Sequence, residues 1–412
     1  MNEQQQISRY VSYMYSYPHK TAYRTLTPPV SLSPYLERLE GREASLYFHI
    51  PFCAHKCGYC NLFSQQCCDA ERISLYLHTM RRQAGQLSVA AQGLKFTSFA
   101  VGGGTPLILD EGQLEELFCL AELFGVHPSR VFTSVETSPE YTQKSVLRQL
   151  RARGVERLSM GVQSFNETEL KKLKRRPGLG TVVGALENIV EAGFPQFNLD
   201  LIYGIEGQTV ESFMRSLNTA LTYRPNELFI YPLYVRPGTR IDVRSTDDIG
   251  YAIYKSAREL LVGSMRRFVR RETTETEFSC GDEVMLSCGA GGRSYLGNLH
   301  YATPYAVRQQ AIADEIDHYI RTTDFMTAAN GFLLSTEEMQ IRFIIKNLMY
   351  HRGVDLAEYE KRFGEKPDRN LFREFTDRGW IEETGRIVRL TEEGMAYSDY
   401  IGQAFISPAV RK

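Results

Sequence analysis

The sequence predicts an α/β protein whose main domain is an open, partial barrel of six strand–helix units. Short apolar or β-branched runs recur along residues 45–236, and a polar turn and a segment of helical length follow most of them. The runs lie at residues 45–50, 94–102, 131–137, 157–163, 196–204 and 227–235. Strands that alternate with helices indicate a parallel sheet. Because a closed barrel of this kind needs about eight units, we expect a lateral gap with room for a large ligand.

Composition and charge narrow the class of protein. With 412 residues, 43% hydrophobic and 24% charged, the chain is typical of a globular protein with one large domain and one or two smaller parts. A formal net charge of −1 gives no general attraction to nucleic acid or an anionic membrane. No apolar run approaches about eighteen residues, and the polar start lacks the features of a secretory signal. We expect a cytoplasmic protein without a membrane or nucleic-acid partner.

The barrel is preceded by a distinct N-terminal arm. Residues 1–44 are rich in tyrosine, proline and turn-forming residues, which predicts an extended conformation. Such an arm either covers an open edge of the main domain or closes over a substrate. Residues 45–236 then form the barrel, with amphipathic helices predicted at 111–124 and 180–193, the second ending at Gly193.

Two further parts follow the barrel. Residues 237–334 predict an extension of it, with a helix at 248–263 and a glycine cluster at 287–295 that permits close approach to another group. Residues 335–412 predict a winged-helix-like domain, because three helices and a hairpin follow one another there. The helix expected near 367–378 carries several carboxylates, which oppose phosphate binding. We therefore expect this domain to cap the barrel.

Three cysteines directly follow the first predicted strand, at Cys-x3-Cys-x2-Cys spacing: Cys53, Cys57 and Cys60. Structural zinc commonly takes four ligands in two separated pairs, whereas three clustered thiols can hold three corners of a metal cluster and leave the fourth open. A zinc site completed by a distant histidine, or a set of buried structural cysteines, is the alternative. Eight cysteines in a chain of this length do not indicate a disulfide framework, and a cluster needs a reducing compartment.

Unusual residues also follow the other predicted strands. Because ligands of parallel β/α domains bind at the carboxyl ends of the strands, we expect these residues to meet the cysteines at one mouth. They are Gly102, Gly103, Gly104 and Thr105 after the second strand, Glu136 and Gln163 at the ends of the third and fourth, Asp200 and Tyr203 in the fifth, and Tyr231, Tyr234 and Arg236 at the sixth.

The cysteine spacing resembles the signature of the radical S-adenosylmethionine (SAM) superfamily. The string Tyr-x-His-Ile-Pro-Phe-Cys from Tyr47 to Cys53, and the later Gly-Gly-Gly-Thr-Pro, are similar to the branch of oxygen-independent coproporphyrinogen III oxidase and its haem-chaperone relatives. The resemblance covers most of the chain. It implies a partial barrel of the radical SAM type, a 4Fe-4S cluster on the three thiolates, and one or two SAM molecules. It also implies a monomeric enzyme that takes an electron from a donor such as flavodoxin or ferredoxin and abstracts hydrogen through a 5′-deoxyadenosyl radical.

The resemblance further implies which residues contact SAM. Three successive glycines let backbone groups approach its amino group without obstruction by Cβ atoms. Glu136 can accept hydrogen bonds from ribose hydroxyls, and Asp200 can bind a hydroxyl or ammonium group. The implied set is Tyr47 at the carboxylate, Tyr59 against the adenine, Gly102, Gly103, Gly104, Thr105, Glu136, Gln163, Asp200, and Arg175 or its neighbour Arg176.

The substrate that the resemblance favours is an acidic small molecule such as a porphyrinogen, because guanidinium and ammonium groups suit its carboxylates. The candidate contacts are His19, Lys20, Arg24, Arg236, Arg240 and Arg293. Leu62, however, replaces a further cysteine of the oxidase, and residues 277–282 lack the His-Asn-x-x-Tyr-Trp string of the chaperones. Three interpretations follow: an oxidase-like radical SAM enzyme, a two-SAM methyl- or methylene-transferase, and a haem-binding carrier.

Overall fold

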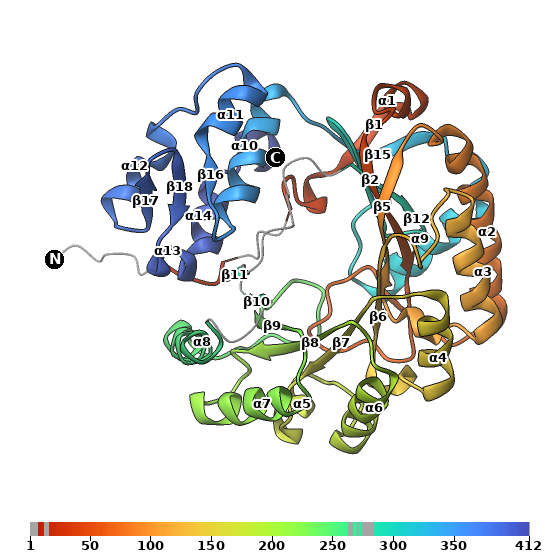
Figure 1. Ribbon diagram of the computed structural model, residues 1–412, viewed down its shortest axis with the longest axis horizontal. Coiled ribbons are helices and arrows are strands. Elements are labelled where there is room, and N and C mark those ends of the chain that lie inside the picture. The colour runs from red at the N-terminus through yellow and green to blue at the C-terminus, as the bar shows by residue number, and fades with distance from the viewer. Residues whose placement is uncertain (1–6, 12–15, 263–266, 270–271, 274–283, 412) are drawn as a thin grey trace.

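The computed structural model describes residues 7–11, 16–262, 267–269, 272–273 and 284–411. The six predicted strands are present and lie side by side as one parallel sheet, which confirms the partial barrel (Figure 1). In spatial order they are β2 (Glu43–Ile50), β5 (Lys95–Gly103), β6 (Phe132–Thr137), β7 (Arg157–Gln163), β8 (Gln196–Tyr203) and β9 (Glu227–Pro232). The stretch 277–282, singled out above, lies outside the described residues.

The helices of the barrel cover the outer face of the curved sheet (Figure 1). They are α2 (Ala70–Ala90), α3 (Glu111–Glu122), α4 (Lys144–Arg153), α5 (Glu167–Lys172), α6 (Leu179–Ala192), α7 (Val210–Thr222) and α8 (Asp247–Leu261). The helices expected at 111–124, 180–193 and 248–263 thus form with small shifts at their ends. Among the helices that the structure describes, none has the length and apolar character required to cross a membrane.

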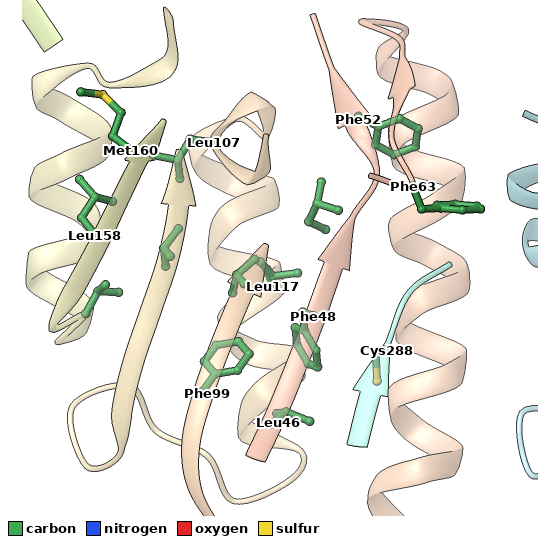
Figure 2. Packing of buried hydrophobic residues seen from close by; sticks show 14 of the residues in the cluster. Leu46, Phe48, Phe52, Phe63, Phe99, Leu107, Leu117, Leu158, Met160 and Cys288 are labelled. Carbon is green, nitrogen blue, oxygen red and sulfur yellow. The ribbon is translucent and has the colours of Figure 1, made fainter. Parts of the chain in front are cut away.

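The space between sheet and helices holds the main hydrophobic core. Alternate residues of β2, including Leu46 and Phe48, point towards the helices and pack near Phe99 of β5 and Leu117 of α3 (Figure 2). Because side chains alternate along a strand, this arrangement turns Tyr47 to the opposite face, inside the barrel. The packing of β2 against the helices therefore also fixes the direction in which its end leads into the three cysteines.

Further strands enlarge the sheet at both edges. β12 (Met285–Cys288) runs parallel to β2 and continues into an antiparallel series. At the other edge, two short strands extend the sheet beyond β9. The series is β13 (Arg293–Leu296), β14 (Leu299–Ala302), β15 (Thr327–Leu333) and β1 (Arg24–Ser31); the short strands are β10 (Arg267–Val269) and β11 (Glu272–Thr273). Helix α9 (Gln309–Arg321) packs beside α2.

The N-terminal arm pairs with the sheet but is not extended throughout. β1 lies antiparallel to β15 at the sheet edge, as a covering strap would. It is followed by α1 (Ser33–Arg38), a helix that the sequence pattern did not predict. Pro34 lies in the first turn of this helix, where its missing N–H is not needed for hydrogen bonding. The prediction of an extended segment is therefore wrong at α1, because Pro34 is compatible with the start of a helix.

The C-terminal residues form helices around a three-stranded sheet with the order β16-β18-β17. Its elements are α10 (Thr336–Leu348), β16 (Val354–Asp355), α11 (Leu356–Phe363), α12 (Asn370–Asp377), β17 (Ile381–Thr384), β18 (Ile387–Leu390), α13 (Glu392–Ala396), α14 (Ser398–Ala404) and α15 (Pro408–Arg411). This part has its own hydrophobic core, which includes Phe343, Trp380 and Val388. In Figure 1 it lies on the side of the barrel opposite α2 and α3.

Tyr17 fastens the N-terminal arm to this second core. Its side chain is fully buried among the C-terminal residues. Its hydroxyl donates a hydrogen bond to Glu338 on α10, and the Arg342 guanidinium donates to its carbonyl oxygen at 2.6 Å. Burial, and then the Glu338 carboxylate, raise the pKa of Tyr17. The arm is therefore held by specific polar contacts in addition to apolar packing.

Replacing this tyrosine tests the attachment. We expect Tyr17→Phe to lower the free energy of unfolding by about 1–3 kcal/mol, because the buried Glu338 carboxylate loses a donor. Urea unfolding measures the loss, and proteolysis near the arm should become faster. Tyr35→Phe, on α1 and outside the C-terminal core, is the matched control. Equal losses in the two variants would show that the hydroxyl contact has no special role.

Candidate functional site

The three cysteines lie on a loop that is closed at its base. β2 ends at Ile50, and the short strand β3 (Phe52–Cys53) pairs with β4 (Gln65–Gln66). The backbone N–H of Cys67 also donates to the carbonyl oxygen of Cys53 at 3.0 Å. The intervening residues thus leave and rejoin the barrel at one point. All described cysteines are free, so the thiols are available as ligands.

Each thiol of the loop has a polar neighbour. The Thr105 hydroxyl donates to Cys53 Sγ at 3.6 Å, and Ser64 Oγ lies 3.7 Å from Cys60 Sγ. The Arg175 Nη1 group donates to Cys57 Sγ at 3.3 Å. Burial raises the pKa of the Cys53 thiol to about 12. A positively charged metal centre would be needed to hold this thiol as thiolate, since metal binding releases the proton.

The thiols face a cavity of about 430 Å³ at the carboxyl ends of the barrel strands. Its wall brings together most residues that were predicted from their strand-end positions. Of the predicted set, the wall contains Lys20, Cys53, Cys57, Tyr59, Cys60, Gly103, Gly104, Thr105, Glu136, Gln163, Arg175, Asp200, Tyr231, Tyr234 and Arg236. Tyr203, in contrast, is fully buried in the main core. The expected convergence of six loops on one mouth is therefore present in the geometry.

The glycine run allows the second strand to lie against the cysteine loop. A Cβ atom on Gly104 would fall 2.5 Å from the Phe52 carbonyl oxygen and 2.9 Å from Cys53 Sγ. Gly103 has a φ of +120°, which a side chain would strongly disfavour. Gly102 lies behind the wall, where a Cβ would approach Glu136 Oε2 to 2.7 Å and Tyr47 Oη to 3.0 Å. Close packing against backbone and side-chain atoms thus explains all three glycines without a ligand.

Two carboxylates lie on the inner face of the barrel. The Gly103 N–H donates to Glu136 Oε2 at 3.2 Å, and Asn198 Nδ2 donates to Asp200 Oδ1 at 2.7 Å. Burial raises the pKa of Glu136 and raises that of Asp200 to about 7. The nearby Arg157 guanidinium opposes both shifts. Two carboxylates that share one cavity suit hydroxyl or ammonium groups as ligands, because such groups donate hydrogen bonds.

The structure distinguishes Arg175 from its neighbour. Arg175 turns into the cavity, where it donates to Tyr59 Oη at 3.3 Å and to the Gly161 carbonyl, whereas Arg176 is exposed. Gln163 lies beside this contact, in a bulge of β7 with a φ of +76°. Tyr47 does not line the cavity; its hydroxyl is 3.1 Å from His49 Nδ1, behind the glycine run.

These residues fit an iron–sulfur cluster and a zwitterionic ligand. Within the described ranges no three His, Cys, Asp or Glu side chains are arranged around a single metal ion. Each thiol instead has its own polar neighbour, and the three thiols lie around one cavity. A cluster can bind such a set because it takes one thiolate at each of three corners. The Arg175 Nε group is buried without a hydrogen-bond partner in the described protein, and it could receive an anionic group. The two carboxylates on the same wall suit a cationic group and hydroxyls.

Cations also gather at the cavity, although not all of those predicted. Lys20 and Arg236 line it. Arg293 lies near enough to lower the pKa of Lys20, which burial and the guanidinium together bring to about 8. His19 is outside the wall, and burial lowers its pKa to about 3, so it contributes no positive charge. Arg24 is exposed and donates to the carbonyl of Ala22 at 2.6 Å, so it is not brought to the cavity.

Sequence reasoning missed one residue of the site and the binding partner of another. Lys56, inside the cysteine motif, is buried and donates from Nζ to three backbone carbonyls, including Ser64 O and Val307 O at 3.0 Å. Its place between two predicted ligands was the available signal. Tyr234 was predicted from its place at the sixth strand and does line the cavity, but the hydrogen bond that its hydroxyl donates to Asp399 on α14 was not predicted. That contact joins residues 165 positions apart, so no local pattern could indicate it.

Comparisons with known proteins agree with this geometry. The family model for the radical SAM superfamily matches residues 47–220, and that for the HemN C-terminal domain matches residues 334–397. Over 389 residues the chain is 27% identical to the heme chaperone HemW of Bacillus subtilis, which covers 88% of this chain and 99% of that protein. It is 26% identical to the oxygen-independent coproporphyrinogen III oxidase of Escherichia coli, over 85% of this chain and 82% of that protein.

The fold agrees with a solved structure as well. Coproporphyrinogen III oxidase (HemN) from Escherichia coli, described as a radical SAM enzyme, matches with a TM-score of 0.78 at 22% identity. The match covers 93% of this chain and 96% of that chain. At this identity the likeness concerns the fold.

An open barrel with three clustered cysteines after its first strand defines a radical SAM protein. The chain belongs to the HemN-like branch of the radical SAM superfamily, whose members named above include both an oxidase and a heme chaperone. Membership implies a 4Fe-4S cluster and SAM as cofactors.

The raised pKa of Asp200 predicts a pH-dependent effect on stability. Its pKa of about 7 in the folded protein exceeds the ordinary value of about 4. Between pH values of about 4 and 7 the native state therefore holds a proton that the unfolded state has lost. Stability should therefore fall as pH rises from about 4 to 7. We expect Asp200→Asn to stabilise the cofactor-free protein at pH 8, by on the order of 1–3 kcal/mol, and much less at pH 5. Thermal unfolding at both pH values, with the exposed Asp314→Asn as control, checks this; a pH-independent difference would contradict it.

Proposed function

We propose that the chain is a radical SAM enzyme that acts on an acidic, porphyrinogen-like substrate. In this proposal Cys53, Cys57 and Cys60 hold a 4Fe-4S cluster, and SAM occupies the adjoining cavity. When bound, the two cofactors supply reductive cleavage of SAM to methionine and a 5′-deoxyadenosyl radical that abstracts hydrogen. The observation that carries the proposal is that one cavity joins the three thiols to Lys20 and Arg236.

The wall near the thiols offers complementary groups for SAM. Arg175 has a buried, unpartnered Nε and is suited to the carboxylate of the methionine part. Asp200 and Glu136, which line the cavity, accept hydrogen bonds from the ammonium or ribose hydroxyls as charged acceptors. Tyr59 is fixed by Arg175 and presents its ring to the cavity, where an adenine can lie against it. Tyr47, in contrast, would act on SAM only after turning away from His49.

The cations that line the cavity, with Arg293 beside them, favour an anionic substrate. Arg236 is supported by the ring of Tyr234, 5.6 Å from its guanidinium carbon. Lys20 lies over the ring of Tyr305 at 4.9 Å, and Arg293 receives support from Ser16 at 2.9 Å. Planar guanidinium groups bind carboxylates in a bidentate manner, and a nearby ammonium adds charge. These three cations thus favour a substrate with several carboxylates over a neutral one.

Cleavage of SAM is the first test. The protein is reconstituted anaerobically with iron and sulfide, reduced with dithionite in the presence of SAM, and assayed for 5′-deoxyadenosine. We expect product from the wild type, more when coproporphyrinogen III is added, and none from Cys57→Ala. Cys288→Ala, which changes a buried cysteine of the main core outside the cavity wall, is the matched control and should retain activity. An assembled cluster that yields no deoxyadenosine, with or without the porphyrinogen, would refute the enzyme.

A haem carrier is the second candidate, and two observations favour it. Leu62 stands where the oxidase has a cysteine; it lines the cavity and remains 47% exposed, so it offers apolar surface to a macrocycle. Several relatives, among them that of Bacillus subtilis, are named heme chaperones. The same cations that suit a porphyrinogen would suit the carboxylates of haem.

Haem titration separates the two candidates. If the chain is the proposed enzyme, we expect no saturation at one haem per chain by absorbance of the bound haem. Stoichiometric binding that Leu62→Asp weakens would support the carrier instead. Leu75→Asp, an equally exposed leucine on α2 that does not line the cavity, is the control for a general effect of lost apolar surface.

A further inference from the structure

A second set of cations lies outside the cavity, against the outer side of the cysteine loop. Two segments cover this side. The carbonyl oxygen of Leu173 accepts from the Gly58 N–H at 2.9 Å, and the Arg240 N–H donates to the Gly58 carbonyl at 2.8 Å. His55 Nε2 lies 3.0 Å from the carbonyl oxygen of Lys174. Both segments are therefore bonded directly to the residues between and beside the cluster cysteines.

These segments carry four exposed cations, which we call the basic patch: Lys171, Lys174, Arg176 and Arg240. In the part of the chain that the structure describes, no salt bridge involves any of them. The nearby carboxylates are fewer than the cations: Glu206 pairs with Lys172 at 2.5 Å, Asp242 follows Arg240 by two positions, and Glu140 lies close enough to Arg175 to raise its pKa. The patch is thus locally positive on a chain whose formal net charge is −1.

The patch is close to the thiols yet separate from the ligand cavity. Arg175 stands between two patch residues in the chain, and its guanidinium donates to Cys57 Sγ at 3.3 Å. Gly58 packs so tightly beneath the patch that a Cβ would lie 3.0 Å from Ile241, the Leu173 carbonyl and Lys174. None of the four patch residues lines the cavity. A partner on the patch would therefore approach the cluster position without displacing a ligand.

We propose that the basic patch is the docking surface for a small acidic protein that carries single electrons on a flavin or an iron–sulfur centre. The inference rests on the proposed function, because reductive SAM cleavage needs an external electron. The reduced carrier is oxidised by one electron, the cluster on the three thiolates is reduced by one, and no bond forms or breaks in this transfer. A positive surface bonded directly to the cysteine loop attracts a negatively charged carrier and orients it towards the acceptor.

The charge distribution favours a protein over a small anion as occupant. The four cations come from two separate segments and are exposed, and no cavity wall gathers them around one point. Two of them are fixed by the backbone: Lys174 donates to the Arg240 carbonyl at 2.5 Å, and Arg240 donates to the Lys56 carbonyl. Such a fixed, spread set of charges is typical of a transient, salt-sensitive protein interface.

The experiment follows electron transfer itself. Anaerobically reconstituted holoprotein is mixed in a stopped-flow instrument with a bacterial flavodoxin, kept reduced by its reductase, and in parallel with a reduced ferredoxin; loss of cluster absorbance reports reduction. The test variant is Lys171→Glu/Arg176→Glu, which leaves the backbone-bonded patch residues in place. Lys361→Glu/Arg373→Glu, at exposed positions of the C-terminal part, is the charge-matched control. Dithionite, which needs no docking surface, is the reference reductant for each protein.

With at least one carrier, we expect the wild type and the control to react quickly at about 50 mM salt and more slowly at about 300 mM. The patch variant should react about tenfold or more slowly at low salt and lose most of the salt dependence. Its dithionite rate should equal that of the wild type. Equal carrier rates in all three proteins, or a dithionite rate that falls as much as the carrier rate, would overturn the proposal. So would a wild-type cluster that dithionite reduces and neither carrier does.

The readout keeps this proposal apart from the proposed function. Cluster reduction is measured without SAM, so it does not depend on SAM cleavage. A protein that accepts electrons through the patch but forms no 5′-deoxyadenosine would refute the proposed enzyme activity and still support the docking surface. Conversely, SAM cleavage driven by dithionite with no effect of the patch variant on carrier rates would support the enzyme and refute the docking surface. Iron content, measured first, identifies a preparation in which a cluster has assembled.

Discussion

One buried ammonium group joins the parts of the molecule on which the site depends. Lys56 Nζ donates to the carbonyl oxygens of Leu62, Ser64 and Val307, at 3.3, 3.0 and 3.0 Å. An ammonium removed from water is strongly penalised unless its donors are used, and here three acceptors use all three. The cysteine loop, the turn after it and the segment before α9 therefore meet at one atom. The positions of the thiols thus depend on a residue more than two hundred positions further along the chain.

The second constraint is the close approach of backbone to backbone around β2. A Cβ on Gly289 would fall 2.4 Å from the His49 carbonyl oxygen, and one on Gly291 would fall 2.8 Å from His49 Nε2. Gly104 makes the equivalent approach to Cys53 from the other side. Because neither neighbour can carry a side chain at these points, the first strand and its loop are enclosed by glycine on both sides. This enclosure orients the thiols before any cofactor binds.

The sequence predicts the site's location better than its contacts. Strand periodicity and the rule that parallel strands end at one mouth are local and topological, so they place Glu136, Gln163 and Asp200 correctly beside the thiols. The contacts that a residue makes, in contrast, depend on the tertiary structure. The glycine cluster at 287–295 was expected to approach something, but only the fold shows that His49 is the neighbour. Arg24 was chosen by charge alone, and its guanidinium instead binds the carbonyl groups of its own turn.

The two groups of cations differ in a way that suits two kinds of binding. Lys20 in the cavity wall is half-buried, with Arg293, Arg236 and Lys56 close enough to lower its pKa, so these charges repel one another in a partly desolvated site. An anionic ligand that enters the cavity relieves this repulsion, and its carboxylates remain bound out of water. The basic patch is exposed, so solvent already screens its charges and a partner gains little lasting stability from them. Strong binding at the inner group and rapid, reversible association at the outer group are the behaviours that a substrate site and an electron-entry surface require.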